Sequence, residues 1–331
     1  MHFIKLYFVL LTIFTCLTEI RAAETQKMIL PDGAHIRLAH WLPHRPSTHP
    51  ATILLLQGRS SYIEKFDETI EDLCNLGYEV WTFDWRGSGG SSRLISSNTQ
   101  KVHIDSYETY INDLDYIIRT QIKSENPQPL ILMGISMGGH LALRYLEEKP
   151  DKIAGAFLIA PMLNIHTNPY PCWLGRLMVT TATWLGFGSA YAFGYGDYNP
   201  NQKIDPKKAG TTDLVRYQRQ LDLNLAKMPL VTSGPTFGWA YETFKSIDLV
   251  NASSSLKKIS APVMIISAGQ EMVIDNSKDS FLCSYIPQCQ IKTYDKARHN
   301  IFIEQDAFRH QLFKDLEEFT STLSMHYKKN M

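Results

Sequence analysis

The sequence predicts an α/β protein, built on a mostly parallel eight-stranded sheet with helices on both faces. Short aliphatic runs such as 51–56 and 130–133 have the continuous apolar pattern of strands that are buried on both faces. Between these runs, apolar residues recur every three or four positions, which is typical of amphipathic helices. Alternation of the two patterns along the chain indicates parallel strands joined by helices.

The expected strands can be placed in chain order. Two short strands flank the turn Pro31-Asp32-Gly33 within 28–42, and six more are expected at 51–56, 78–85, 130–133, 153–159, 263–266 and 291–294. Helices are expected from about 63 to Gly77, over 105–123, after residue 139, and in the last segment, where Phe308, Leu312, Leu316, Phe319 and Leu323 share one face. These elements would form one core in two parts, 24–161 and 248–331.

The strand pattern stops between the sixth and seventh expected strands. The segment 162–247 is instead rich in aromatic residues, with scattered glycines among them. We interpret it as a helical cap, or lid, that is inserted after the sixth strand and lies over the carboxyl ends of the strands.

The first 23 residues have the character of a targeting segment. Leu6 to Leu17 is almost unbroken in its apolar character, but it is shorter than the roughly 20 residues that span a bilayer. Small residues follow at Ala22 and Ala23, where a secretory signal peptide would be cleaved. We expect export to the periplasm or the medium, with an uncleaved N-terminal anchor as the alternative.

Composition narrows the class of protein. Lys plus Arg and Asp plus Glu both number 33, and no basic run is present, so a nucleic-acid partner is not expected. No cysteine or histidine cluster has zinc-finger spacing, and no metal is expected. After the leader, four cysteines remain. Cys283 and Cys289 lie at an expected helix end and strand start, where a disulfide could form; the alternative is that all four are buried thiols.

The motif Gly134-x-Ser136-x-Gly138 points to nucleophilic catalysis. It follows an apolar strand and begins a helix, which is the setting of a strained turn that exposes a serine hydroxyl. A serine nucleophile needs an adjacent base. Glycines two positions before and after the serine suit the crowded backbone of such a turn.

The base and the acid should follow the serine in the chain. His299 lies between the eighth expected strand and the last helix, whereas His140 and His166 precede the seventh strand and do not fit this order. The acid that orients the histidine is expected just past the seventh strand. Glu271 is the favoured acid, and Asp275 is the alternative, although Asp275 could also be only a helix cap.

An acyl-transfer site also needs donors for the oxyanion. The expected donors are the backbone N–H groups of Met137, next to the serine, and of Arg59, in the loop after the third strand. The side chain of Arg59 could separately meet an anionic group of a substrate, or it could form an ordinary surface ion pair.

These residues belong to a set of separated motifs. They are Gln57-Gly58-Arg59, Asp84-Trp85-Arg86-Gly87-Ser88-Gly89-Gly90-Ser91, His103-Ile104-Asp105-Ser106-Tyr107, Gly134 to Gly139, Gly234-Pro235-Thr236-Phe237-Gly238-Trp239 and Ala297-Arg298-His299. Over nearly its whole length after the leader, the chain resembles an α/β-hydrolase of the monoacylglycerol lipase and bacterial lysophospholipase group (serine aminopeptidase S33-like). The resemblance implies carboxylic ester hydrolysis without a metal or organic cofactor, under a helical lid that binds acyl chains. It also implies that Gln57, Gly58 and Trp239 contribute to substrate binding.

Two departures from the family pattern keep a second function open. Gln57-Gly58 stands where many relatives have His-Gly, and Glu271 stands where most have aspartate. The first hypothesis is a serine hydrolase that cleaves lysophospholipids or monoacylglycerols through an acyl-enzyme on Ser136, with association to a membrane surface as a further expectation. The second is a non-catalytic lipid- or partner-binding protein on the same fold. The sequence leaves the head group, the acyl length and the oligomeric state open.

Overall fold

The computed structural model describes residues 25–122, 128–149, 153–252 and 254–329. It contains an eight-stranded sheet in the order β1-β2-β4-β3-β5-β6-β7-β8. The strands are β1 (Gln26–Ile29), β2 (His35–Trp41), β3 (Thr52–Leu56), β4 (Glu79–Phe83), β5 (Leu130–Ile135), β6 (Gly155–Ile159), β7 (Val263–Ala268) and β8 (Cys289–Tyr294). Among the described strands, the pairs β1–β2 and β2–β4 are antiparallel and the other five pairs are parallel. The sheet is therefore mostly parallel, as predicted.

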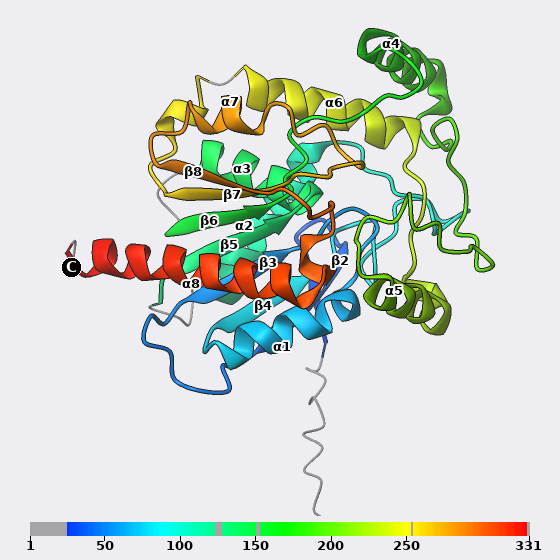
Figure 1. The fold of residues 1–331 in the computed structure, drawn as a ribbon. Coiled ribbons are helices and arrows are strands. Elements are labelled where there is room, and N and C mark those ends of the chain that lie inside the picture. Colours follow the sequence, from blue (N-terminus) through cyan, green and yellow to red (C-terminus); the bar gives the residue numbers. More distant parts are fainter. Residues whose placement is uncertain (1–24, 123–127, 150–152, 253, 330–331) are drawn as a thin grey trace, which may run out of the picture.

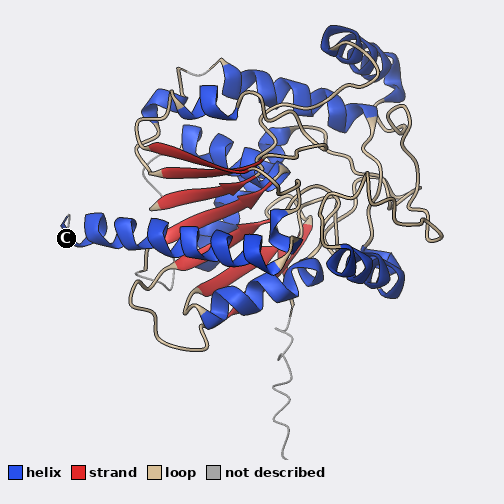
Figure 2. Cartoon of the chain, in the orientation of Figure 1, coloured by secondary structure: helices blue, strands red, loops and turns tan. Residues whose placement is uncertain are grey.

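Helices cover both faces of this sheet (Figures 1 and 2). One face is covered by α1 (Asp67–Asn75) and α8 (Asp306–Lys329). The other is covered by α2 (Tyr107–Ile117), α3 (Met137–Glu148), α6 (Phe237–Asn251) and the short α7 (Asp279–Cys283). The predicted fold class is confirmed.

Two hydrophobic cores result from the alternation of side chains along each buried strand. In β3, Ile53 and Leu55 pack with α1 and α8, whereas Leu54 and Leu56 pack with the helices of the opposite face. All five residues of β3 are buried. This explains why the sequence has a continuous apolar run there, without the alternation of polar and apolar residues that a half-exposed strand would need.

The helices differ in detail from those expected. The expected helix over 105–123 is α-helical only to Ile117 and continues as a π-helical turn at Ile118–Ile122. The expected helix from 63 begins as a 3-10 turn at Ile63–Phe66 before α1. As expected, Gly77 follows α1, with a φ of +88° that favours glycine.

The insertion between β6 and β7 carries α4 (Cys172–Ala182), α5 (Leu214–Ala226) and α6. Figure 1 shows α4 and α5 beyond the ends of the strands, outside the layers that cover the sheet. Helix α6 continues past residue 247 and packs on α2 and α3. The division of the chain at residues 162 and 247 stays a prediction.

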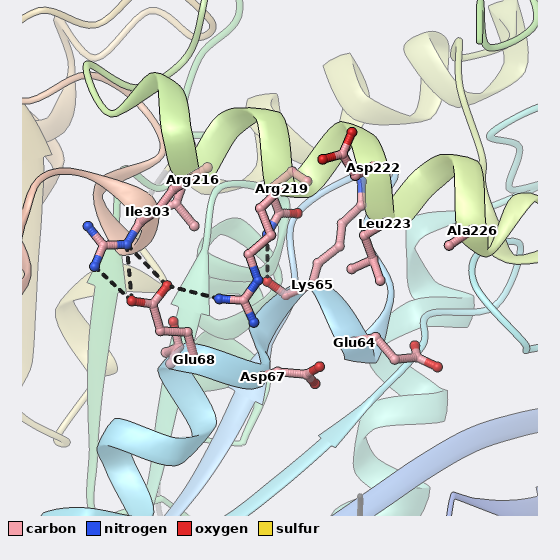
Figure 3. Close-up of a pocket in the computed structure, with 12 residues that line it drawn as sticks. Glu64, Lys65, Asp67, Glu68, Arg216, Arg219, Asp222, Leu223, Ala226 and Ile303 are labelled. Atoms are coloured by element: carbon pink, nitrogen blue, oxygen red, sulfur yellow. Dashed lines mark hydrogen bonds and ion pairs between the residues drawn. The ribbon is translucent and has the colours of Figure 1, made fainter. Parts of the chain in front are cut away.

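Ion pairs attach the α5 part of the insertion to the core. Arg216 and Arg219 of α5 both point toward Glu68 of α1 (Figure 3), with Arg216 Nη2 2.7 Å from Glu68 Oε1. Lys227, which follows α5, pairs with Glu64 at 3.3 Å. The cap is therefore fixed to the core partly by polar contacts at its margin.

Cys283 and Cys289 form a disulfide between the end of α7 and the start of β8, with a Cα–Cα distance of 5.4 Å. This is the pairing that the sequence suggested. Cys74 is a buried free thiol and Cys172 an exposed one. The expected leader, residues 1–23, lies outside the described residues, and none of the described helices is long and apolar enough to cross a bilayer.

Candidate active site

Ser136 lies in the tight turn between β5 and α3. Its backbone has φ +52° and ψ −115°, a region that side-chain-bearing residues rarely adopt. Three backbone hydrogen bonds hold it there: its N–H donates to the Ile159 carbonyl at 3.0 Å, and its carbonyl accepts from His140 at 3.1 Å and Met162 at 3.0 Å. The surrounding backbone therefore maintains a strained turn, as such sites require.

The two glycines of the motif are needed because the turn packs against neighbouring backbone. A Cβ at Gly138 would lie 2.1 Å from the Leu56 carbonyl oxygen, and one at Gly134 would lie 2.6 Å from the Gly139 Cα. No side chain fits at either position without backbone movement. These clashes explain why the motif has glycine two positions before and two positions after Ser136.

Glu271 and His299 come together at the same edge of the sheet, after β7 and β8. The Nδ1 of His299 lies 2.7 Å from Glu271 Oε2, and both side chains are almost fully buried. Glu271 Oε1 accepts three backbone N–H groups, from Met272 at 2.9 Å, Val273 at 2.7 Å and Ile274 at 3.2 Å. The carboxylate is thereby fixed in one orientation.

This environment favours the ionised form of Glu271. Burial alone would raise the pKa of its carboxyl group, but the hydrogen bond and charge of His299 and the backbone N–H groups lower the pKa below its ordinary value. A carboxylate bound to Nδ1 keeps the hydrogen on that nitrogen and leaves Nε2 free to accept a proton.

Asp275, the alternative acid, has other partners. Its Oδ2 accepts from the Asn164 side chain at 2.7 Å, and its Oδ1 accepts from the backbone N–H of Ser277 at 3.0 Å. In the described part of the chain, Glu271 is the carboxylate that contacts His299. The geometry therefore favours Glu271 over Asp275 as the orienting acid.

Over the residues that the structure describes, the Ser136 hydroxyl forms no hydrogen bond with His299. Such bonds are often made only once substrate fills a site. His140 does not replace His299 as the base, because it is fully buried with Nε2 2.7 Å from Ser246 Oγ, and burial and the nearby Arg144 lower its pKa to about 3.

The expected oxyanion donors lie beside the serine. A Cβ at Gly58 would be 3.4 Å from the Ser136 Cβ, so the Gly58-Arg59 backbone runs against the nucleophile. Met137 is the first residue of α3, where backbone N–H groups have no partner within the helix. Among the described residues, neither the Met137 nor the Arg59 amide donates a hydrogen bond, so both are available to an oxyanion.

A cavity of about 420 Å³ opens above Ser136, between the core and the insertion. Its wall is mainly apolar and aromatic, and it includes Met178 and Val179 of α4 and Phe237, Trp239 and Phe244 of α6. Residues that the sequence analysis did not assign to substrate binding also line it: Met162, Ile165, His166, Thr167, Asn168, Pro169, Tyr170, Phe193 and Tyr195. Only the aromatic content of the segment signalled their role.

The predicted substrate-binding residues are placed differently from one another. Trp239 and Arg59 line the cavity, and Gly58 lies against Ser136. The side chain of Gln57 is fully buried and does not line the cavity; its Nε2 donates to Thr82 Oγ1 at 3.3 Å, and its backbone carbonyl accepts from the Trp85 indole at 2.9 Å. Gln57 therefore fixes the loop after β3 to the residues at the end of β4 and does not contact the cavity.

Comparison with known proteins agrees with this geometry. Residues 47–306 match the family described as serine aminopeptidase, S33. The chain belongs to this family. Among curated S33 relatives, it is 28% identical over 275 residues to the probable lysophospholipase L2 of Haemophilus influenzae, a match that covers 82% of this chain and 84% of that protein. It is 26% identical over 317 residues to the monoglyceride lipase of Saccharomyces cerevisiae, covering 87% and 90%.

Solved structures of other proteins have the same fold. A soluble variant of the Saccharomyces cerevisiae monoglyceride lipase in complex with a substrate analog superposes with a TM-score of 0.72 at 22% identity, covering 91% of this chain and 95% of that one. The resemblance to the monoacylglycerol lipase and lysophospholipase group is confirmed, and the chain is a carboxylic ester hydrolase.

Proposed function

We propose that this S33 hydrolase cleaves the ester of single-chain lipids, lysophospholipids or monoacylglycerols, through an acyl-enzyme on Ser136. The observation that carries the proposal is the buried Glu271–His299 pair at 2.7 Å, at the sheet edge where the strained Ser136 turn opens into an apolar cavity. The names of the relatives, lysophospholipase and monoglyceride lipase, support the substrate class.

In the proposed mechanism, Ser136 Oγ attacks the ester carbonyl carbon while its proton passes to His299 Nε2. Glu271 stabilises the imidazolium that forms. The negative charge on the carbonyl oxygen is met by the Met137 and Arg59 N–H groups. When the tetrahedral intermediate collapses, His299 returns the proton to the departing glycerol oxygen, and water, activated by the same histidine, then releases the fatty acid.

The cavity suits one acyl chain. Its volume of about 420 Å³ lies at the lower end of the roughly 300–1,000 Å³ of small-molecule sites. The apolar side chains of α4 and α6 would cover the hydrocarbon, which removes it from water. A lipid with a single chain is therefore favoured over one with two.

The outer surface of the cap supports the proposal that the protein binds to a membrane surface. Large apolar side chains of α4 and the turn after it are exposed: Trp173 by 67%, Leu177 by 54%, Trp184 by 89%, Leu185 by 63% and Phe187 by 58%. An exposed patch of this kind usually marks an interaction site, and tryptophan suits a lipid–water interface. The proposed occupant is the lipid surface that supplies the substrate.

Export is part of the same proposal. The apolar leader within residues 1–23 and the Cys283–Cys289 disulfide both support it, because disulfides persist in oxidising compartments such as the periplasm. Appearance of the protein only in the cytoplasm, with both thiols reduced, would contradict this part.

The central test combines a substitution with covalent labelling. Ser136→Ala should reduce turnover of oleoyl lysophosphatidylcholine and of monoolein by at least about 10³-fold and abolish labelling by a fluorophosphonate. Ser61→Ala, which replaces a serine outside the cavity wall, is the matched control and should keep both activities. The alternative, a non-catalytic lipid-binding protein, predicts that neither the wild type nor the variant is labelled or active.

A further inference from the structure

Arg59 has an unusual position for a charged residue. It lines the same cavity as Ser136, and its backbone runs beside the nucleophile. Its guanidinium carbon lies 5.4 Å from the ring centre of Trp239 and 5.8 Å from that of Tyr195. The charge is thus held against two aromatic rings in the wall of a mainly apolar cavity.

Arg59 lacks the carboxylate partner that Arg86 and Arg37 have; Arg93 and Arg298 also lack one, but each of them donates to at least three backbone carbonyls. Arg86 pairs with Asp32 and Asp113, and Arg37 with Glu64 and Asp84. Arg59 forms no ion pair with any residue that the structure describes. The surface ion pair considered from the sequence is therefore absent from the described part of the chain.

The donors of Arg59 are also largely unused. Nη1 donates to the Ser233 carbonyl at 3.2 Å, and the same carbonyl accepts from Ser60 Oγ at 2.9 Å. A guanidinium has five N–H donors in a planar fork. Burial lowers the pKa of Arg59 because no carboxylate compensates for the loss of water, yet an arginine remains charged in proteins. A partly buried cation with unused donors is stabilised when a ligand anion joins it.

We propose that the Arg59 side chain binds the phosphodiester of a lysophospholipid substrate and selects such lipids over neutral monoacylglycerols. This inference rests on the proposed ester hydrolysis at Ser136. With the ester carbonyl at Ser136, the acyl chain lies along α4 and α6, and the glycerophosphate extends toward Arg59. Arg59 follows Gly58, which lies against Ser136, and its side chain lines the cavity that Ser136 also lines. The planar fork matches two phosphate oxygens.

The alternative is that Arg59 only braces Trp239 and Tyr195. A brace affects every substrate of the cavity equally, whereas a phosphate ligand affects only lipids that carry phosphate. The ratio of two specificity constants therefore separates the two roles, even where a variant loses some activity overall.

The experiment compares kcat/KM for oleoyl lysophosphatidylcholine and monoolein, which share one acyl chain. Arg59→Gln should lower the ratio of the first to the second by about 10- to 100-fold, and Arg59→Lys by less, because lysine keeps the charge and loses the fork. Arg219→Gln, an exposed arginine outside this cavity, is the control and should leave the ratio at its wild-type value. An equal loss on both substrates in Arg59→Gln would overturn the inference.

A binding measurement makes the inference independent of turnover. In the Ser136→Ala background, an ether-linked lysophosphatidylcholine that cannot be hydrolysed should bind at least about tenfold more weakly when Arg59 is Gln, while the matching alkylglycerol should bind with nearly the same affinity. If oleate alone depends on Arg59, the anion recognised is the carboxylate of the product and the inference fails. If Ser136→Ala were as active as the wild type, the proposed mechanism would fail, but this binding result would still decide the role of Arg59.

Discussion

The helix that follows the nucleophile and the first helix of the cap are about equally long, but they are built differently. Ten residues of α3 are buried, and the helix packs on β5 and β6. No residue of α4 is buried, although its sequence is the more hydrophobic of the two. The helix that follows Ser136 is thus enclosed by the rest of the chain, whereas the first helix of the cap leaves much of its apolar surface uncovered.

This difference separates two tasks. Positioning a serine, a histidine and a carboxylate requires side chains and backbone held by many contacts, such as the three N–H groups on Glu271. Receiving a lipid requires apolar surface that the protein itself does not cover. We therefore expect substitutions at the sheet edge to affect chemistry and folding strongly, and substitutions in the cap to affect access and binding more mildly.

The largest effect is expected at Glu271. In Glu271→Gln, the carboxamide oxygen would take the three backbone N–H groups and turn the NH₂ toward His299. Nδ1 would then have to accept, which puts the ring hydrogen on Nε2, where a general base cannot have it. We expect kcat to fall about 10³–10⁴-fold with little change in stability, as measured by initial rates and thermal unfolding.

Asp275→Asn is the matched control, since Asp275 lies four residues further on and binds Asn164 and Ser277. Its kcat should stay within about threefold of the wild type. A loss at Asp275 comparable to that at Glu271 would mean that the acid has been assigned to the wrong residue.

Substitutions of two glycines, one in α3 and one in the cap, test whether the core is packed more tightly than the cap. Gly138→Ala places a methyl group 2.1 Å from the Leu56 carbonyl oxygen, where only backbone movement can relieve the clash. The free energy of unfolding in urea should fall by about 3–4 kcal/mol. Gly196→Ala in the cap meets no atom within 4 Å and should change it by less than about 0.5 kcal/mol. Equal effects at the two glycines would refute the contrast in packing.

The sheet could be predicted from the sequence because local patterns determine it. Strands such as 51–56 are buried on both faces, so every position is apolar and the run stands out. Ser136 and His299 could be proposed from the turn motif and from chain order, since Ser136 directly follows β5 and His299 lies in the loop between β8 and α8. The preference for Glu271 over Asp275 depended only on where the two residues lie after the seventh strand, because the contact with His299 is set by loop geometry after β7 that leaves no pattern in the sequence.

The cap was harder to predict for a physical reason. Its first helix, α4, has no buried residue and is mostly apolar, so burial imposes no polar and apolar alternation that would show where the helix begins and ends. The cavity wall at 162–170 is irregular backbone and gives no signal beyond its composition. Even the position of Gln57, whose side chain points to Thr82, follows from the turn of the loop after β3.

The exposed aromatic side chains of the cap allow a test of the membrane proposal. Trp184 is 89% exposed and does not line the cavity. The Trp184→Ser variant should bind phospholipid vesicles about tenfold more weakly in sedimentation, because its indole would no longer insert at the interface. Hydrolysis of a short-chain, water-soluble ester should stay at the wild-type rate. Unchanged vesicle binding would show that this patch is not the membrane contact.

The smallest effect concerns the attachment of the cap. Arg216 of α5 pairs with Glu68 of α1 and with Asp306 at the start of α8, at 2.7 and 2.6 Å, and its side chain is only 19% exposed (Figure 3 shows the Glu68 contact). Arg216→Met should lower the free energy of unfolding by about 1–2 kcal/mol and speed proteolysis within the cap, and 1 M salt should reduce the difference. Arg219 is the control on the same helix: its side chain is 61% exposed and lies 3.8 Å from Glu68. Arg219→Met should lower the free energy of unfolding by less than about 0.5 kcal/mol. If the two variants behave alike, ion pairs at this margin do not hold the cap, and its attachment must come from the apolar contacts of α6 on the core.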